Sequence, residues 1–245
     1  MESQAAALND FEQLVRVLEQ GAELTMDPDL RSDLFAFKAN ILDARLHAPE
    51  RAIEAWRQTL GARPDHQDAF VALERLLGDA GRTVELCETL EKHAEVVVEA
   101  PQREGLIKRM AALYESPLGD LGKAIVAWRS VLDLDQENAE AMDALARLYA
   151  ATSSWQELVE VLQQKIDCTP DAQQLRALRF QAAELLDTRL DRLSDAAEQL
   201  RAILENAPDD TDALDMLASI FVREKQHAEL VEVLDRRVRL AKNAS

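Results

Sequence analysis

A stretch of nine residues recurs four times in this chain at a constant interval of 72 residues. The four copies occupy 11–19, 83–91, 155–163 and 227–235. Leucine stands at the fourth and the eighth position of every copy, at Leu14, Leu86, Leu158 and Leu230 and at Leu18, Leu90, Leu162 and Leu234. Because no insertion or deletion disturbs the interval, the sequence indicates a repeat architecture and argues against one globular core.

The same interval aligns the rest of the chain. Segment 51–60 matches 123–132 and 195–204, and each of these three segments has alanine at its second position. The sequence therefore divides into three 72-residue units and a terminal helix, at 11–82, 83–154, 155–226 and 227–242. No stretch rich in Gly, Pro or Ser separates the units, so we expect residues 1–245 to form a single continuous array.

Each 72-residue unit contains four helical patterns. In the first unit, apolar residues recur three or four positions apart over 11–25, 28–46, 50–61 and 66–79. Pro28, Pro49 and Pro64 mark the boundaries, since proline fits the first turn of a helix or the loop before it. The pattern predicts an all-α fold of about 13 helices. Neighbouring helices should be antiparallel because the loops between them are short.

Hairpins of this kind must stack, because a single helical hairpin cannot cover its own apolar side. One helical pattern contains Ala141-Met142, Leu145-Ala146 and Tyr149, and another contains Ala52, Trp56, Leu60 and Pro64. These patterns resemble the first and the second helix of the tetratricopeptide repeat family. The resemblance implies a right-handed α–α superhelix (a solenoid).

The chain departs from the family pattern at several places. Glu74 occupies a position that the pattern gives to a small residue. The second helices of alternate hairpins begin with a leucine where the family has alanine, at Leu86, Leu158 and Leu230. The loop before Ala52 and its equivalents is about one residue longer than usual in that family.

The charge balance excludes several classes of partner. With 46 acidic and 28 basic residues, the net charge is −18, which repels phosphate backbones and anionic lipid. No apolar stretch approaches the ~18 residues of a spanning helix. We therefore expect no nucleic-acid binding and no membrane insertion. The start of the chain has no secretory signal, so we expect a cytoplasmic protein.

The sequence shows no constellation that supports catalysis. Its four histidines are scattered without metal-ligand spacing, and it has neither a glycine-rich phosphate loop nor a nucleophile elbow. The stretch Asp133–Asn138 resembles a calcium loop, but Asn138 stands where the sharp turn requires glycine. We expect no catalytic residue, no metal site and no cofactor, and hence not an enzyme.

Both cysteines and two of the three tryptophans are expected to be buried in the core. Cys87 and Cys168 lie within apolar helical patterns and are expected to be small buried thiols. Trp56 and Trp128 share an apolar column with Leu200 and are expected in the core. Trp155 shares a mixed column that is typical of a half-exposed helix start.

Residues 1–10 align with 73–82 and 145–154, which predicts that one helix ends before the next begins at Phe11. Neither end of the chain shows a polar capping helix. We expect a piece of a longer array, or open ends that dock on a partner or on another copy.

The remaining candidate for function is a surface. The resemblance implies that the first helix of each hairpin lines a concave face that receives a peptide. The inward positions are Asn40, Arg75, Lys108, Asp143, Arg147, Glu184 and Asp215. Arg75 and Arg147 are one period apart and could stack to hold a carboxylate of a peptide. The alternative is that they are solvated or pair with neighbouring acids such as Asp143.

Two acidic columns also recur. Acids at Asp68, Glu140 and Asp212 fall in the first turn of a helix, where they complement its dipole. The second column, Asp43, Glu115 and Asp187, lies near helix C-termini, where an acidic side chain is slightly unfavourable because of the helix dipole. This position favours a partner-binding role for these three residues. The sequence thus predicts a non-catalytic scaffold that binds a basic or amphipathic protein segment. The alternatives are self-assembly through uncapped ends and a fragment of a larger multi-domain protein.

Overall fold

A computed structural model describes residues 2–243 of the chain, with side chains from Asp10 to Lys242. Over these residues it contains thirteen helices and no strand. The helices are α1 Glu2–Leu24, α2 Pro28–Ala44, α3 Pro49–Ala62, α4 Gln67–Asp79, α5 Thr83–Val96, α6 Ala100–Glu115, α7 Leu121–Leu134, α8 Ala139–Ala151, α9 Trp155–Cys168, α10 Ala172–Thr188, α11 Leu193–Asn206, α12 Thr211–Glu224 and α13 His227–Asn243. The predicted all-α repeat fold is confirmed.

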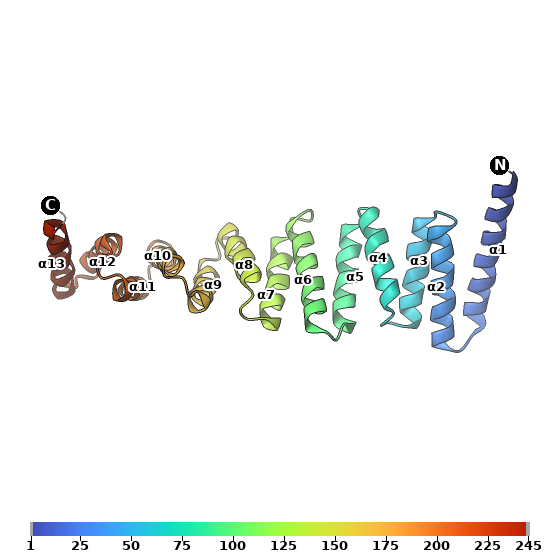
Figure 1. Ribbon diagram of the computed structural model, residues 1–245, viewed down its shortest axis with the longest axis horizontal. Helices are drawn as coiled ribbons and strands as arrows, with labels where there is room; N and C mark the ends of the chain where they lie inside the picture. Colours follow the sequence, from blue (N-terminus) through green and yellow to red (C-terminus); the bar gives the residue numbers. More distant parts are fainter. Residues whose placement is uncertain (1, 244–245) are drawn as a thin grey trace. The chain divides into compact units, whose positions relative to one another are not determined.

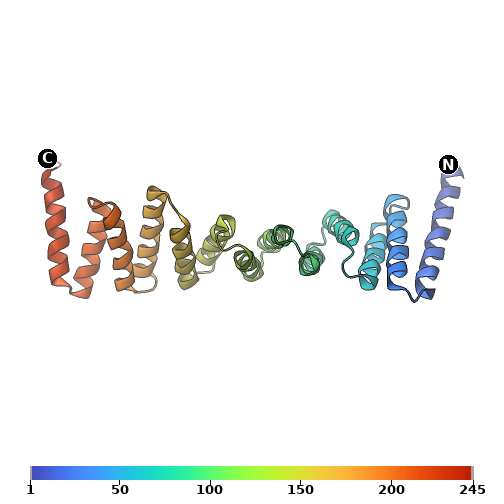
Figure 2. The ribbon, with the colours of Figure 1, turned by 60° about the horizontal axis from the view of Figure 1, so that its bottom comes forward.

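The chain forms two compact structural units, Met1–Leu134 and Asp135–Ser245, which differ from the 72-residue sequence units. From here on, the first and the second unit are these two structural units. The first unit contains α1 to α7 and the second contains α8 to α13. Within each unit, successive helices run antiparallel and lie side by side (Figures 1 and 2). Within a unit, every pair of consecutive helices packs together. That residues 1–245 form a single continuous array stays a prediction, as do the self-association of the ends and the idea of a longer parent array.

The helix starts repeat with the sequence. The residue before α4, α8 and α12 caps each helix with its side chain, at positions one period apart. His66 Nδ1 accepts the N–H of Ala69 at 3.3 Å, and Asn138 Oδ1 accepts the N–H of Ala141 at 3.1 Å. Asp210 Oδ1 does the same for the third helix. Such caps satisfy N–H groups that have no partner inside the helix. Asn138, within the calcium-like stretch, is thus a helix cap.

The loops repeat as closely as the helices. Residues with positive φ stand at two positions of the period, at His47, Gly119 and Asp191 and at Gly81, Ser153 and Lys225. Each is followed by a residue whose N–H bonds back to a carbonyl in the preceding helix, as Arg82 does to Leu77 at 2.9 Å and Gln226 to Phe221 at 3.0 Å. These left-handed residues follow α2, α4, α6, α8, α10 and α12, and turn the chain from each of them into the next helix.

The first helix differs from the prediction. The repeat alignment predicts a break before Phe11, but α1 runs without interruption from Glu2 to Leu24. A break removes backbone hydrogen bonds within the helix, and elsewhere in the chain helix–helix packing on both sides offsets that loss. In the described structure α1 packs mainly on α2, with an ion pair from Glu12 to Arg51 of α3, so a straight continuation keeps its hydrogen bonds. Met1 lies outside the described residues.

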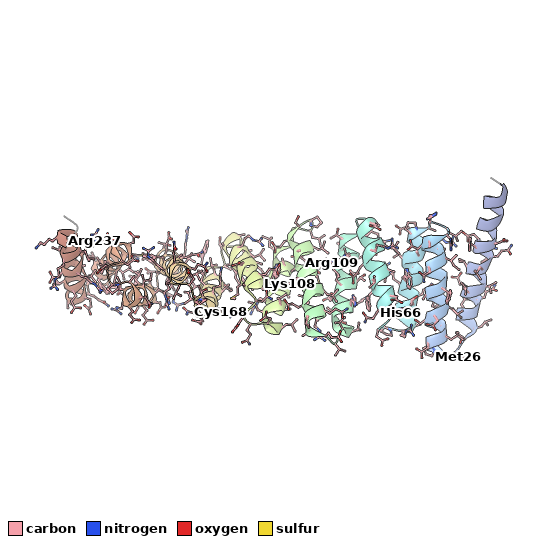
Figure 3. The ribbon with its side chains drawn as sticks, in the orientation of Figure 1. Met26, His66, Lys108, Arg109, Cys168 and Arg237 are labelled. Atoms are coloured by element: carbon pink, nitrogen blue, oxygen red, sulfur yellow. The ribbon has the colours of Figure 1, made fainter. Side chains whose placement is uncertain are left out.

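The core is aliphatic with a few large aromatic residues. Trp56 and Trp128 are 3% and 5% exposed, as predicted, and Trp155 is half-buried. Cys87 is buried, and burial raises the pKa of its thiol. The prediction for Cys168 is wrong: this cysteine is exposed (Figure 3). It is the last residue of α9, where the helix ends and no longer turns this position toward a neighbour.

Candidate protein-interaction surfaces

All of the predicted partner-binding residues lie on the first helices of the hairpins. In the first unit these are Asn40 and Asp43 on α2, Arg75 on α4, and Lys108 and Glu115 on α6. In the second unit they are Asp143 and Arg147 on α8, Glu184 and Asp187 on α10, and Asp215 on α12. We call the surface formed by α8, α10 and α12 the first-helix face of the second unit. Arg75 and Arg147 belong to different units, so their predicted stacking stays a prediction.

The acidic column near the helix C-termini makes contacts within the chain. Asp43 pairs with Arg75, which joins α2 to α4. Asp187 pairs with Arg223, which joins α10 to α12 in the same manner. Glu115 Oε1 accepts the indole N–H of Trp128 at 2.7 Å. These contacts, two between successive hairpins and one within a hairpin, account for acids at the ends of helices where the dipole disfavours them.

Most of the other predicted positions also have partners close by. Lys108 Nζ lies 2.8 Å from Glu104 one turn away on α6, and Figure 3 shows Lys108 on that helix. Asn40 donates to the Ala36 carbonyl at 3.0 Å. Two of the aspartates pair with a basic residue of the following helix, Asp143 with Lys165 and Asp215 with Arg237. A partner would therefore compete with existing contacts at these positions.

A pocket of about 570 Å³ opens between α10 and α12 on the first-helix face of the second unit. Its lining residues are Arg176, Ala177, Phe180, Gln181, Glu184, Asp212 and Met216. Phe180 and Met216 are half-buried, and the Glu184 carboxylate is exposed. Of the predicted residues, the structure brings Glu184 into this pocket. In the described part of the chain, that carboxylate forms no salt bridge or side-chain hydrogen bond.

Arg176 is held in place at one end of the pocket. Its guanidinium lies 4.5 Å from the centroid of the Phe180 ring and binds Asp210 and Asp212, the latter at 2.8 Å. The hydrogen bond from Arg176 lowers the pKa of Asp210 below its usual value, and the same contact raises the pKa of Arg176. Because Arg176 is already paired with acids, the charge left open to a partner is that of Glu184.

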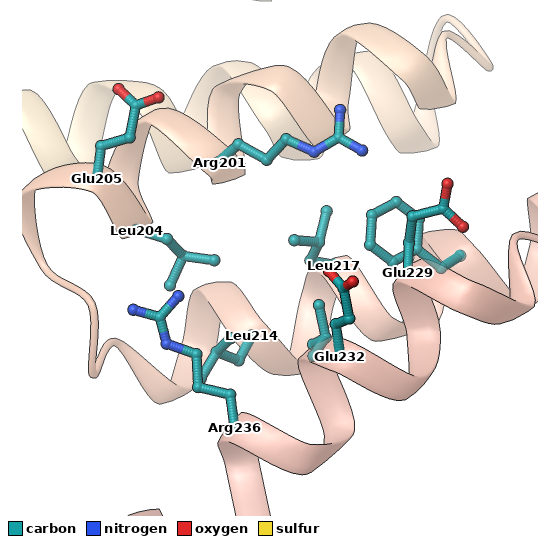
Figure 4. A pocket seen from close by; sticks show the side chains of 10 residues that line it. Arg201, Leu204, Glu205, Leu214, Leu217, Glu229, Glu232 and Arg236 are labelled. Atoms are coloured by element: carbon teal, nitrogen blue, oxygen red, sulfur yellow. The ribbon is translucent and has the colours of Figure 1, made fainter.

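Two further pockets lie on the side of the second helices, and the sequence reasoning missed them. One lies over α3, α4 and α5 and has a volume of about 570 Å³; the other lies over α11, α12 and α13 and has about 390 Å³ (Figure 4). Their lining residues correspond at an interval of two periods: Arg57 to Arg201, Leu73 to Leu217, Glu85 to Glu229, Glu88 to Glu232, and Lys92 to Arg236. These recurring charged columns were the signal in the sequence that could have revealed the pockets.

One carboxylate of the α3–α5 pocket, that of Glu85, is neutralised by the chain itself. Glu85 binds Arg57 and also Arg82, whose Nη2 lies 2.6 Å from Glu85 Oε2. The two guanidinium groups hold the pKa of Glu85 at about 2. This carboxylate is therefore charged at any physiological pH and fully paired.

Metal-binding clusters and membrane-spanning helices are both absent from the described residues. Among the described residues, no group of three or more His, Cys, Asp or Glu side chains could hold a metal ion. Over the same residues, no helix has both the length and the apolar character needed to cross a membrane.

Comparisons with known proteins agree with this architecture. Residues 141–177, which span α8 and the beginning of α10, match the sequence model of the tetratricopeptide repeat. Superkiller protein 3 of Schizosaccharomyces pombe is 24% identical over 128 residues, which cover 51% of this chain and 9% of that protein. The chain thus spans a small part of this curated relative.

One solved structure shows the same kind of fold, and another is similar at a lower score. A chain in the structure of Naa15/Naa10 bound to HypK-THB superposes with a TM-score of 0.53 at 15% identity, over 99% of this chain and 37% of that chain. YrrB, a TPR protein with an unusual peptide-binding site, matches over 93% of this chain and 91% of its own at 14% identity, with a TM-score of 0.35. The 72-residue sequence repeat, the stacked helical hairpins and the match over residues 141–177 show a helical-repeat fold that is similar to the tetratricopeptide repeat family.

Proposed function

We propose that this chain is a non-catalytic scaffold that holds a segment of a partner protein against the first-helix face of the second unit. The observation that carries the proposal is the α10–α12 pocket, which combines a half-buried apolar floor with one carboxylate that has no partner within the described residues. A pocket of this size accommodates a large side chain of a bound segment.

The lining residues indicate what kind of segment fits. Phe180 and Met216 offer an aromatic ring and a flexible thioether, which pack well against an aliphatic or aromatic side chain. Glu184 lies at the same pocket and can form a charge-assisted hydrogen bond with a lysine or arginine. The partner should therefore present a basic residue close to a large apolar one, in keeping with the net charge of −18.

Selection from a library of random peptides displayed on phage tests the proposal. The full chain serves as bait, and we expect enriched peptides to carry Lys or Arg beside a large apolar residue. Glu184→Lys should weaken binding of the enriched peptides by about tenfold or more, because it replaces an attraction by a repulsion. Binding is measured by fluorescence anisotropy with labelled copies of these peptides.

The matched control is Glu198→Lys, an equal charge change at an exposed position of α11 outside the α10–α12 pocket. It should leave the affinity close to that of the original chain. Peptides that bind Glu184→Lys and the original chain equally well would remove the α10–α12 pocket from the proposal.

A further inference from the structure

The two second-helix pockets have corresponding linings but differ in how their carboxylates are paired. In each, a floor of leucines and other apolar residues lies between an arginine from one second helix and two glutamates from the next. The same kind of pocket therefore occurs twice, with equivalent lining residues 144 positions apart in the sequence. The two pockets differ in the ion pairs that Glu85 forms and that its equivalent Glu229 lacks among the described residues.

In the α3–α5 pocket, Arg82 supplies the cation that completes the pairing of Glu85. Its Nε lies 2.7 Å from Glu85 Oε1, and its Nη1 binds Glu50 at 2.6 Å. Arg82 stands three residues before Glu85, so it reaches the carboxylate from the beginning of the same helix. Arg57 binds Glu85 from the opposite wall.

In the α11–α13 pocket both of these contacts are missing. The residue equivalent to Arg82 is Gln226, which carries no charge. Arg201, equivalent to Arg57, lies over the Phe221 ring at 5.4 Å from its centroid and forms no salt bridge with Glu229. In the described part of the structure, neither Glu229 nor Glu232 has a side-chain partner, and both are exposed.

Each pocket is lined by a third carboxylate, Glu95 in the α3–α5 pocket and Glu205 in the α11–α13 pocket. Glu205 lines the α11–α13 pocket at the position that Gly61 holds in the other copy. Figure 4 shows Glu229 and Glu232 on α13 at one side of the pocket, with Arg201 on α11 at the other. Below them lie buried leucines, among them Leu214 at 0% and Leu217 at 2% exposure. The rim thus carries more acid than base above an apolar floor.

We propose that the α11–α13 pocket is a second protein-binding site, which takes a large apolar side chain together with an adjacent lysine or arginine. The apolar side chain contacts the leucine floor, and the cation lies between Glu229 and Glu232, which are three residues apart and so face the same side of α13. The partner's cation takes the place that Arg82 occupies in the first copy. This site lies on the second helices and does not depend on the α10–α12 pocket.

The experiment transfers the first copy's arginine to the second. The probe is a fluorescein-labelled amphipathic helical peptide with Leu on one face and Lys on the other. The reference is the same peptide with Glu in place of Lys. We expect Gln226→Arg to weaken binding of the Leu/Lys peptide by about tenfold, since the new guanidinium competes for Glu229. Glu229→Gln with Glu232→Gln should weaken it at least as much. Neither variant removes a buried residue.

Glu198→Gln is the matched control, because it removes one exposed carboxylate of α11 outside the pocket. It should change the affinity little, and the Leu/Glu peptide should bind weakly to every variant. The proposal is overturned if Gln226→Arg and the double glutamine variant both bind the Leu/Lys peptide as the original chain does. It is also overturned if Glu184→Gln alone abolishes binding, which would assign the peptide to the first-helix face.

Discussion

At the scale of single residues, one ion pair of the repeat has moved to a different place in the first unit. In the second unit, Asp143 pairs with Lys165 and Asp215 with Arg237, at positions one period apart (Arg237 is labelled in Figure 3). The equivalent residues in the first unit are Val71, which is 61% exposed, and His93. The acid stands three residues later instead, at Glu74.

This shift changes an exposed ion pair into a buried cluster. Glu74 Oε1 lies 2.7 Å from His93 Nδ1, and Arg109 Nη1 lies 2.5 Å from Glu74 Oε2. His93 Nε2 lies 2.9 Å from Gln67 Oε1, and its ring stacks on Phe70 at 4.5 Å. Glu74 and His93 are 8% and 3% exposed. The sequence showed Glu74 as an exception among small residues, but its partners lie 19 and 35 residues away and only the packing of α4, α5 and α6 reveals them.

Glu74→Ala should therefore destabilise the chain, although alanine is the natural residue at the equivalent positions 146 and 218. The substitution leaves His93 buried without its acceptor and removes the partner of Arg109, at a cost of about 2–4 kcal/mol in the free energy of unfolding. Urea denaturation followed by circular dichroism measures this. Asp143→Ala, which removes an acid that is 67% exposed, is the control and should cost less than about 1 kcal/mol. Equal losses in the two variants would contradict the assignment.

At the scale of helices and loops, the sequence predicted the positions of the elements better than it predicted the side-chain contacts. The 72-residue period and the proline positions predicted helices at 28–46, 50–61 and 66–79, and α2, α3 and α4 begin and end within about two residues of those bounds. The left-handed residues were harder to predict. Gly81 signals the end of a helix, whereas Ser153 and Lys225 adopt the same conformation without such a signal. Packing of the hairpin imposes this turn on residues that do not favour it.

The glycines of the α4 C-terminus allow a test of that conclusion. Gly78 and Gly81 both have open space where a Cβ would be, but φ is positive, at 67°, only at Gly81. Gly81→Ala should lower the free energy of unfolding by about 1 kcal/mol, because alanine disfavours the left-handed region. Gly78→Ala should raise it by about 0.5–1 kcal/mol, because alanine favours the helix. Thermal or urea unfolding of the two variants should show opposite signs, and a shift in the same direction would refute the interpretation.

At the scale of the whole molecule, stability is built from contacts between neighbours in the chain. The helix pairs that pack extensively within the described residues are all consecutive. One hydrophobic cluster, which includes Ile53, Leu73 and Leu90, belongs to the first unit, and another, which includes Leu200 and Leu217, belongs to the second. The repeat predicted such a chain of local contacts. It could not predict the division near residue 134, because the period continues through that point unchanged.

A destabilised helix should accordingly affect its own unit more than the other. Glu74→Ala should speed amide hydrogen exchange in α3 to α6, while exchange in α10 to α13 stays as in the original chain. Leu217→Ala, which opens a cavity at a residue 2% exposed and costs about 2–5 kcal/mol, should produce the reverse pattern. Exchange measured by mass spectrometry on peptic fragments distinguishes the two. If either substitution lowers protection evenly across both units, the chain unfolds as one cooperative body, and its stability is not a sum of local contacts.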